Sequence, residues 1–542
     1  MRKAFLCGWR KPNAFRVFVV MECDWEQIFV KNKKKKYKHV DAPIPAYAKI
    51  DGKFPRDALR IINYITNPDK IAAHSFLPFI GYDIEERRVS KIDKTKPKEQ
   101  QKSIVKLRPI KYASHFDSLI YSYYACLLYD LYEQKLADFG LDDVVLAYRK
   151  SQYMHKIANN ITFAKEVFDI IKGKNNNCLA LAFDIKSFYD NIDHNNLKIE
   201  WRKLLYGNDY TGRLPADHFQ IYKSLTDYSF VAIDAIKMYL RCPCGDLLCK
   251  ECESCPLEKG YKLPQKLFKN MDEFHKFREW YKKRPKIKLR SIEESKYQQI
   301  LDNKRVFNFN LGILDKEAPF GIPQGSPMSA LLANIYMLPF DMAMKQKCDE
   351  YHAVYRRYSD DILIICDKDS KEPISAFMMK AIKERGVHLI IHPIGEGRKS
   401  KSKCYDFSSP RILQDPLQYL GFTFNGKDVK VRGASFARYL RKSARGIHSM
   451  RVATQNKIKR LVADGREPAT FKPRLNRKSL YEKYTHLGHR NFWSYVNRAF
   501  KDMECQSLRK QMNKHFNRVS KLISDEDVLF AKFLSTLKPK RE

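Results

Sequence analysis

The chain has 542 residues, of which 44% are hydrophobic and 13% are aromatic. This composition excludes a disordered polypeptide, and the length allows several domains with sizeable cores. Lys and Arg number 101 against 62 Asp and Glu, which gives a formal net charge of +39 and indicates a polyanionic partner such as nucleic acid.

Hydropathy and cysteine usage limit where the chain is expected to act. No apolar run approaches the roughly 18 residues that a membrane span requires, and the basic start lacks the apolar centre of a signal peptide. The 13 cysteines are mostly scattered, which is typical of free thiols in a reducing compartment. We therefore expect a cytoplasmic protein with no membrane partner.

The first predicted elements are a linker and a helix. Residues 91–103 are polar and rich in lysine, which favours a linker. From Leu107 onward the pattern turns helical. The apolar residues that recur at three- and four-residue steps, as on one buried helix face, are Ile120, Tyr123, Tyr124, Leu127 and Leu128.

Two later segments are predicted to form strands that carry aspartates. The run "CLALAFDI" at 178–185 has the length of a strand that is buried on both faces, and Asp184 lies at its end. The segment "YHAVYRRYSDDILIICD" at 351–367 predicts a strand, a tight turn and a second strand, with Asp360 and Asp361 at the turn.

These three carboxylates converge if the strand and the hairpin are neighbours in one antiparallel sheet. Three carboxylates stay ionised together only when a cation offsets their repulsion, and hard oxygen ligands select Mg²⁺ or Mn²⁺. Two such ions suit nucleotidyl transfer. Taken alone, however, a pair of aspartates in a turn is more often a plain turn, because aspartate favours turns.

The remaining segments are a long interruption, a loop with its helix, and a basic end. Residues 201–318 are less regular and contain a cysteine cluster. The segment at 320–341 begins as a glycine-proline loop and continues as a helix. Residues 417–424, "LQYLGFTF", predict a strand, and the chain beyond about residue 430 is basic and mostly helical in pattern.

Several motifs resemble those of reverse transcriptases and follow that family's order. The resemblance is closest to the bacterial branch, which includes retron, group II intron and defence-associated (abortive-infection, unknown-group) enzymes. The motifs are "RPI" at 108–110, "LAYRK" at 146–150, "LAFDIKSFYDNIDH" at 181–194, "GIPQGSPMSALLANIYM" at 321–337, "YSDD" at 358–361, "KSKCYDF" at 401–407 and "QYLGFTF" at 418–424, the last resembling the primer-grip hairpin.

The resemblance implies an α+β fold with the right-hand polymerase architecture of fingers, antiparallel-sheet palm and helical thumb. It divides the chain into an N-terminal extension at 1–104, fingers and palm at 105–428, and a basic helical thumb or C-terminal domain at 429–542. The stretch at about 201–318 is longer than a minimal palm needs, so it is predicted to be an insertion that contains the cysteines.

The resemblance also assigns roles to individual residues. Asp184, Asp360 and Asp361 are the expected catalytic metal ligands, together with the carbonyl of Ile185. Tyr189 is expected beneath the sugar, where its ring would clash with a 2′-hydroxyl and favour deoxynucleotides. The other expected contacts are Gln324 and Gly325 in the nucleotide pocket, Arg108 and Arg149 on the triphosphate, Lys401 on the departing pyrophosphate, and Tyr358 and Ser359 at the primer end.

The cysteine cluster leaves two interpretations open. Its short spacings suit a structural zinc site of four thiolates, yet there is one cysteine too many and no pair of separated knuckles. The alternative is a reduced, thiol-rich surface loop. The cysteines concerned are Cys242, Cys244, Cys249, Cys252 and Cys255.

The predicted function is RNA-directed DNA polymerisation, in which deoxynucleoside triphosphates extend a primer along an RNA template to give a DNA product. The resemblance leans toward bacterial antiviral defence with a dedicated noncoding RNA. Three alternatives stay open: template-independent or protein-primed DNA synthesis, RNA-directed RNA synthesis, and a scaffold that binds RNA without catalysis. The sequence leaves open whether the chain forms a homo-oligomer.

Overall fold

The computed structural model describes eleven stretches of the chain. Their residues are 58–88, 104–149, 152–153, 156–175, 177–232, 307–310, 312, 315–395, 401–408, 415–472 and 474–537. Within these residues, no helix is both long and apolar enough to cross a bilayer.

The centre of the fold is a four-stranded antiparallel sheet, here called the palm sheet, with the order β10-β5-β9-β8. Its strands are β5 (Leu179–Asp184), β8 (Val354–Tyr358), β9 (Asp361–Cys366) and β10 (Lys403–Asp406). The predicted strand that ends in Asp184 and the predicted hairpin are thus confirmed, and they are direct neighbours in one sheet.

The two faces of the palm sheet are buried in two different cores. Leu181 and Ile364 belong to one core, whereas Ala180 and Leu363 belong to the other. Side chains alternate between the faces of a strand, so a strand that is buried on both faces must be apolar throughout. This explains why "CLALAFDI" is an unbroken apolar run.

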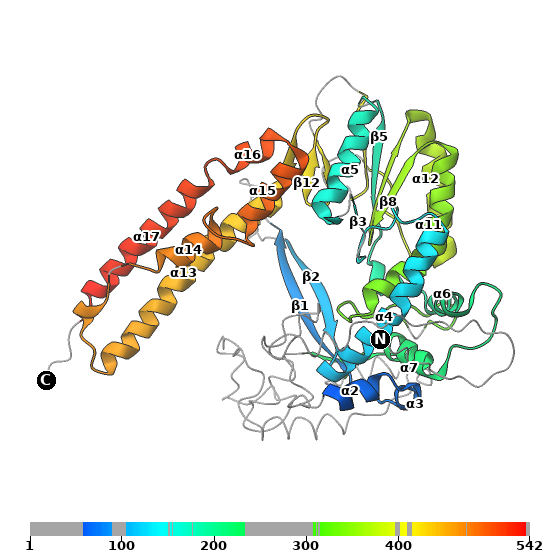
Figure 1. Cartoon of the computed structure of the whole chain (residues 1–542), viewed down its shortest axis with the longest axis horizontal. Coiled ribbons are helices and arrows are strands. Elements are labelled where there is room, and N and C mark those ends of the chain that lie inside the picture. Colours follow the sequence, from blue (N-terminus) through cyan, green and yellow to red (C-terminus); the bar gives the residue numbers. More distant parts are fainter. Residues whose placement is uncertain are drawn as a thin grey trace, which may run out of the picture.

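Helices cover both faces of this sheet (Figure 1). The helices of the first core are α4 (His115–Asp138), α6 (His194–Tyr206), α7 (Ala216–Thr226), α11 (Ser329–Glu350) and α12 (Lys371–Arg385). Those of the second core are α5 (Asn160–Gly173), α15 (Phe492–Met503) and α16 (Gln506–Met512), which pack with the three-stranded sheet of β11 (Leu417–Tyr419), β12 (Phe422–Phe424) and β13 (Val429–Val431).

A second four-stranded sheet, whose strands β1 and β2 lie below the palm sheet in Figure 1, has the order β2-β1-β6-β7. Its strands are β1 (Phe79–Arg88), β2 (Ile104–Tyr112), β6 (Ser229–Ala232) and β7 (Phe307–Phe309), and the short helices α2 (Ala58–Ile65) and α3 (Pro68–Ala72) lie nearby. The range 201–318 therefore includes α7 and β6, which pack with the main body, while residues 233–306 lie outside the described residues.

The helical pattern expected from Leu107 onward was wrong for its first residues. Residues Ile104–Tyr112 form β2, and the helix begins only at His115, where the side chain of Ser114 accepts a hydrogen bond from the backbone N–H of Asp117. Pro109 fits β2 because β2 is an edge strand, where a missing N–H donor is tolerated. The predicted buried stripe is confirmed at Ile120, Tyr124 and Leu128.

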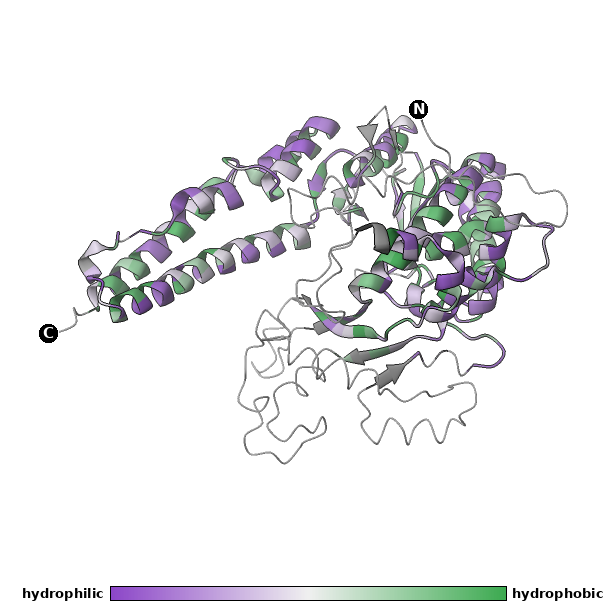
Figure 2. Ribbon diagram, turned by 60° about the horizontal axis from the view of Figure 1, so that its bottom comes forward, coloured by the Kyte–Doolittle hydropathy of each residue, from purple (hydrophilic) through white to green (hydrophobic). Residues whose placement is uncertain are grey.

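The C-terminal residues form a long helical arm that extends away from the palm (Figure 1). We use "the arm" for α13 (Gly433–Ala463), α14 (Arg477–Tyr484) and α17 (His515–Ser535). Its core is a single apolar stripe that includes Ile447 and Ile523, and in Figure 2 its helices carry mixed hydrophilic and hydrophobic bands. The helical character predicted beyond residue 430 is therefore confirmed.

Other short elements complete the described structure. They are β3 (Gln152–Tyr153), β4 (Lys156–Ile157), η3 (Phe188–Asn191), η6 (Lys368–Ser370) and η7 (Pro468–Thr470). The expected strand at 417–424 is instead the hairpin of β11 and β12, because Leu420 and Gly421, with φ of 44° and 93°, turn the chain back on itself.

Candidate active site

Three carboxylates meet at one end of the palm sheet. Asp184, the last residue of β5, lies directly opposite Asp361, the first residue of β9. Asp360 occupies the turn before β9, and its carbonyl accepts a hydrogen bond of 3.0 Å from the backbone N–H of Ile185. Residues opposite each other in an antiparallel pair have Cα atoms about 4.5–5.5 Å apart. The structure therefore brings together aspartates that are far apart in the sequence.

The turn that carries Asp360 has a constrained backbone. Ser359 has a φ of 60° and is buried, a conformation that a residue with a side chain adopts only when its surroundings hold it there. The guanidinium of Arg357 donates a hydrogen bond of 3.1 Å to the carbonyl of Ser359. Tyr358 precedes this turn as the last residue of β8 and is half-buried.

The crowding of the carboxylates changes their acidity. The side chain of Asp361 reaches solvent, yet protein surrounds it on most sides. This burial, together with the charges of Asp360 and then Asp184, raises the pKa of Asp361 to about 7. Burial also raises the pKa of Asp360, against a smaller opposing effect of Arg108. A bound cation would offset both the burial of these carboxylates and their mutual repulsion.

Lys401, which lies just before β10 on the other side of β5, reaches the same cluster. Its ammonium lies 2.9 Å from Oδ2 of Asp184. The pairing of β10 with β5, which sets Lys403 opposite Ala182, brings the preceding Lys401 level with Asp184. The structure thus places this predicted phosphate-binding lysine beside the three carboxylates.

The donor atoms at this site suit a hard divalent cation. Carboxylate and carbonyl oxygens are the ligands that Mg²⁺ and Mn²⁺ prefer, and the charges of Asp360 and Asp184 contribute to the raised pKa of Asp361. Among the residues that the structure describes, no three His, Cys, Asp or Glu side chains are already arranged as a metal site. The chemistry of the donors fits magnesium, and the ligand set stays a prediction.

Tyr189 lies beside the catalytic turn in η3. Its ring is partly buried against the first core, whereas the neighbouring Phe188 is fully within that core. Burial, followed by the nearby hydroxyl of Tyr148, raises the pKa of Tyr189, while the nearby side chain of Ser359 has an opposing effect. The expected sugar-facing aromatic therefore lies near the turn that carries the aspartates.

The Gln324–Gly325 loop connects η3 with the β1–β2 sheet. The backbone N–H of Ile322 donates to the carbonyl of Tyr189 at 2.9 Å, and the N–H of Lys111 in β2 donates to the carbonyl of Gln324 at 2.8 Å. Gly325 has a φ of 118°, and a Cβ at this position would lie 2.7 Å from the carbonyl oxygen of Lys111. The loop requires glycine because two backbones approach closely here.

The two predicted triphosphate-binding arginines have different environments. Arg108 in β2 is close enough to the turn that its charge opposes part of the rise in the pKa of Asp360. Arg149 does not face the site, because its side chain is 2% exposed and its guanidinium donates to Glu133, Asp142 and the carbonyl of Val145. Its five N–H groups are thereby occupied, so this geometry argues against a role on the triphosphate.

A buried network behind the catalytic turn was not predicted from the sequence. Arg357 and Asp341 are fully buried and form two hydrogen bonds of 2.7 and 2.6 Å. Arg357 also donates to Asn334 of α11 at 3.2 Å, and Tyr355 donates to Asp341 at 2.7 Å. The only sequence signal was the pair Arg356-Arg357 within an otherwise apolar strand, where alternation buries one arginine on each face.

The predicted zinc ligands cannot be placed. Cys242, Cys244, Cys249, Cys252 and Cys255 lie outside the described residues, so both interpretations of the cluster stay open.

Comparison with known families identifies the chemistry of part of the chain. Residues 276–424 match the family described as reverse transcriptase (RNA-dependent DNA polymerase). The match includes Gln324, Asp360, Asp361 and Lys401, and it begins after Asp184. It gives the chain an RNA-directed DNA polymerase domain, which is a nucleotidyltransferase, and the described helices and sheets fit the α+β right-hand polymerase fold. No curated protein matches the chain.

Solved structures with a distant likeness include telomerases of two Candida species. Telomerase from Candida albicans, in complex with a TWJ fragment of telomeric RNA, has a TM-score of 0.34 at 10% identity, and the alignment covers 90% of this chain and 72% of that one. Apo telomerase from Candida tropicalis gives 0.35 and 10%, with 86% and 60% covered. Its form truncated from the C-terminal domain gives 0.32 and 12%, with 68% and 59% covered. These scores are too low to support any conclusion about function.

Proposed function

We propose that this chain copies an RNA template into DNA by adding deoxynucleotides to a primer. The observation that supports the proposal best is the register of the palm sheet, which sets Asp184 opposite Asp361 and next to Asp360. Three carboxylates on a rigid sheet, within a chain that contains a reverse transcriptase match, suit metal-assisted nucleotidyl transfer.

In this proposal the primer 3′-hydroxyl attacks the α-phosphate of the incoming nucleotide, a phosphodiester bond forms, and pyrophosphate leaves. Asp184, Asp360, Asp361 and the carbonyl of Ile185 would hold Mg²⁺ or Mn²⁺. When bound, such ions activate the attacking hydroxyl and stabilise the charge on the leaving group. The palm sheet contributes the fixed spacing of the carboxylates.

The surrounding residues bind and orient the two substrates. Gln324 and Gly325 line the nucleotide pocket, where the exposed backbone of Gly325 allows a ligand to approach closely. Arg108 offers a bidentate fork to the triphosphate. Lys401, at 2.9 Å from Asp184, is within reach of the pyrophosphate. Tyr358 and Ser359 border the primer end, because they precede Asp360 in the turn.

Tyr189 excludes ribonucleotides in this proposal. Its hydroxyl lies near Tyr148 and near Ser359 of the catalytic turn. A ring fixed in this place leaves no room for a 2′-hydroxyl, which favours DNA synthesis over RNA synthesis.

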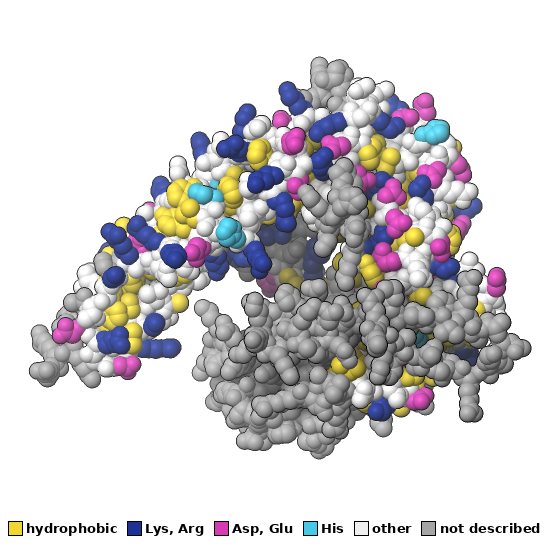
Figure 3. Space-filling model, viewed as in Figure 1, with side chains coloured by type: hydrophobic (Ala, Val, Ile, Leu, Met, Phe, Trp, Pro, Cys, Tyr) yellow, Lys and Arg dark blue, Asp and Glu magenta, His cyan; other side chains and the backbone are white. Residues whose placement is uncertain are grey.

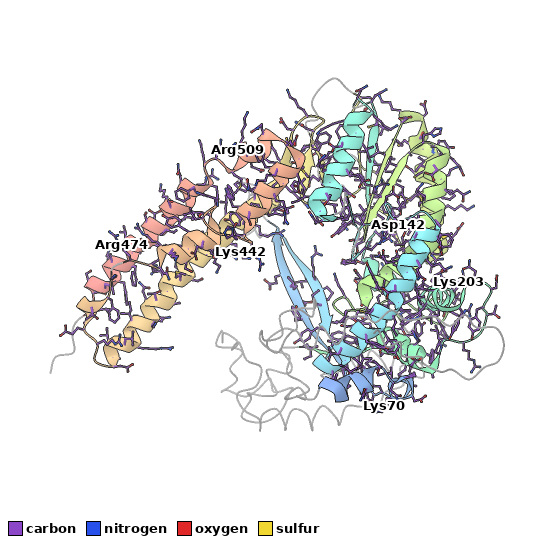
Figure 4. The ribbon with its side chains drawn as sticks, in the orientation of Figure 1. Lys70, Asp142, Lys203, Lys442, Arg474 and Arg509 are labelled. Atoms are coloured by element: carbon purple, nitrogen blue, oxygen red, sulfur yellow. The ribbon has the colours of Figure 1, made fainter. Side chains whose placement is uncertain are left out.

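The arm and the charge of the chain support RNA and DNA as partners. Four exposed basic residues of α13 recur at three- and four-residue steps and therefore share one face of the helix. They are Arg438, Arg441, Lys442 and Arg445. Figure 3 shows Lys and Arg side chains along the visible face of the arm, and Figure 4 labels Lys442, Arg474 and Arg509 in this region. Such a surface binds phosphate backbones.

The biological setting that we propose is bacterial antiviral defence in the cytoplasm, with a dedicated noncoding RNA as the template. The support is the resemblance of the motifs to defence-associated enzymes. Sequencing the nucleic acid that copurifies with the full chain tests this part: recovery of one discrete noncoding RNA is expected, whereas random cellular RNA would count against it.

Primer extension tests the polymerase itself. We expect the full chain to extend a DNA primer on an RNA template with deoxynucleotides, and Asp360→Ala and Asp361→Ala to lose roughly a thousand-fold in rate, which corresponds to about 4 kcal/mol of transition-state stabilisation. Asp369→Ala is the matched control, because Asp369 is an exposed carboxylate in η6 away from the cluster. Activity that survives both substitutions would remove the assignment.

A further inference from the structure

One segment next to the catalytic turn is held in place much more firmly than an ordinary loop. We call residues 144–149 the strap. The backbone of β8 fixes its first half, because the N–H of Arg357 donates to the carbonyl of Val144 at 2.8 Å and the N–H of Leu146 donates to the carbonyl of Arg357 at 3.0 Å. The side chain of Asn334 in α11 donates to the carbonyl of Ala147 at 3.0 Å.

Arg149 fixes the other end of the strap. Its guanidinium donates to the carbonyl of Val145 at 2.8 Å and, at 2.9 and 2.7 Å, to both carboxylate oxygens of Glu133 in α4. The contacts with Asp142, which Figure 4 labels, close the same loop. Arg149 therefore holds the end of the strap against α4. Tyr148 lies between two residues that hydrogen bonds fix, Ala147 and Arg149.

The conformation of Tyr148 is unfavourable in two respects. Its φ is 61°, in the left-handed region that a bulky residue with a Cβ rarely adopts. Its side chain is 53% exposed, so burial of the ring does not compensate for the strained backbone. Strain that the surrounding structure maintains is a feature of ligand-binding and catalytic segments.

The position of Tyr148 indicates a role for this strained backbone. The backbone of the strap places Tyr148 beside the catalytic turn, because Val144 and Leu146 pair with Arg357, two residues before Ser359. The effect of its hydroxyl on the pKa of Tyr189 agrees with this position. The ring therefore lies close to the residue expected beneath the sugar, while about half of its surface stays exposed. An exposed aromatic face in this place can pack against a base or a sugar.

We propose that the ring of Tyr148, together with that of Tyr189, contacts the incoming deoxynucleoside triphosphate. The strap holds the ring of Tyr148 in the position needed for this contact. This inference rests on the proposed polymerase function and adds a substrate-binding residue to it. The strained backbone, the exposed ring and the fully anchored neighbour Arg149 follow from one role.

Single-nucleotide extension by the full chain, with thermal unfolding of the same proteins, tests the inference. Tyr148→Gly removes the ring and relieves the backbone, because glycine adopts positive φ freely. We expect its KM for the deoxynucleotide to rise roughly tenfold, as base–aromatic contacts usually contribute, while its Tm stays at or above that of the wild type. Tyr148→Phe keeps the ring and should keep the KM within about twofold, as the ring supplies the contact.

His352→Gly is the matched control. His352 is an exposed residue with a φ of 50° in the turn between α11 and β8, so the substitution relieves strain of the same kind away from the site. It should leave the KM unchanged. A rise in KM in both glycine variants would mean that backbone strain alone is being measured, and the inference would be wrong.

The remaining outcomes separate this inference from the function on which it rests. If the wild type does not extend a primer, the proposed function fails and the inference fails with it. If the wild type extends and Tyr148→Gly keeps the wild-type KM, only the inference is overturned. A Tyr148→Gly protein with a lowered Tm would also overturn it, because Tyr148 would then be a structural residue.

Discussion

Arginines in the palm and arginines on the arm have opposite environments. In the palm, Arg357 is fully buried and paired with Asp341, and Arg356 is nearly buried and paired with Glu166. On the arm, Arg438, Arg441 and Arg445 are exposed. A buried charge must keep its partner, so it fixes geometry, whereas an exposed charge contributes little to stability and remains available to a ligand.

The hydrophobic cores differ in the same way. The palm sheet is covered on both faces, so its strands are apolar along their whole length, while each arm helix buries only one stripe. Damage to a buried group should therefore disrupt the palm, and damage to an exposed group should change only what the arm binds.

The largest expected effect is the loss of the buried arginine behind the catalytic turn. Arg357→Ala leaves Asp341 as an unpaired buried charge, which costs about 3–5 kcal/mol. Arg445→Ala on the arm is the control and should change stability by less than about 0.5 kcal/mol. Urea unfolding of both variants measures the difference. Equal effects in the two regions would contradict the comparison.

A double substitution sharpens this result. Arg357→Met with Asp341→Leu removes both charges, and apolar replacement of a buried ion pair is often neutral for stability. The double variant still lacks the hydrogen bond from Arg357 to the carbonyl of Ser359. We expect it to recover most of the stability while primer extension stays slow. Full recovery of the rate would show that the arginine does not position the turn.

Local patterns in the sequence were sufficient to predict much of the palm. The unbroken apolar run before Asp184, the turn around Asp360 and the helix after Gly325 each depend on short-range periodicity and turn chemistry. The meeting of the carboxylates followed from the expectation that strand and hairpin are neighbours. These features were predictable because each is encoded within a few consecutive residues.

Features that depend on distant partners could not be predicted. Arg149 resembled a phosphate ligand in its motif, but Glu133 and Asp142 occupy its donors. The pairing of Arg356 with Glu166 joins residues that are 190 positions apart. The strand character of residues around Leu107 was missed as well, because it depends on pairing with β1, where Leu107 lies opposite Glu85. Sequence periodicity contains no information about such partners.

The next effect in size concerns two glycines, one in each region. Gly325→Ala forces a Cβ to within 2.7 Å of the Lys111 carbonyl at a φ of 118°, and we expect it to cost about 1–3 kcal/mol and to raise the KM for the deoxynucleotide. Gly465→Ala, after α13, also has a positive φ of 94° but has no atom within 4 Å of the added Cβ.

Chemical unfolding and single-nucleotide extension of these two variants separate crowding from backbone strain. Gly465→Ala should cost only about 1 kcal/mol, from its backbone conformation, and should leave the KM unchanged. If Gly325→Ala is no worse than Gly465→Ala in either measurement, the close approach of the loop to β2 has no consequence.

A smaller change is expected when the arm loses charge. The combined substitution of Arg438, Arg441 and Arg445 by Ala should lower the slope of log affinity against log salt for an RNA–DNA duplex by roughly 2 to 3. The rate at saturating substrate should be unchanged. Lys345→Ala with Lys347→Ala is the control, because these lysines of α11 are ion-paired with Asp349 and Glu350. An unaltered slope in the arm variant would remove the arm from the nucleic-acid interface.

The smallest expected effect is a pH dependence of the arm. His515 is buried, and its Nε2 lies 2.7 Å from the carbonyl of Tyr484 and 3.2 Å from the hydroxyl of Tyr439. Burial lowers the pKa of His515, the Tyr484 carbonyl opposes this, and the nearby His486 and Arg518 lower the pKa further.

The sign of the effect follows from which state binds the proton. Below the ordinary histidine pKa of about 6.5, the unfolded chain takes up a proton that the folded arm resists, so the arm loses stability as the pH falls and keeps a constant stability above that value. Hydrogen exchange in α13 and α17 should therefore quicken at pH 5.5 relative to pH 7.5, after correction for intrinsic exchange rates. His515→Gln should remove this difference, and the exposed His352→Gln should not. The hydrogen-bond partners of His515 that the structure describes, Tyr439 and Tyr484, both belong to the arm. Protection of β5 and β9 against hydrogen exchange should therefore stay the same at both pH values. A parallel loss of protection in the palm would show that the two regions unfold as one.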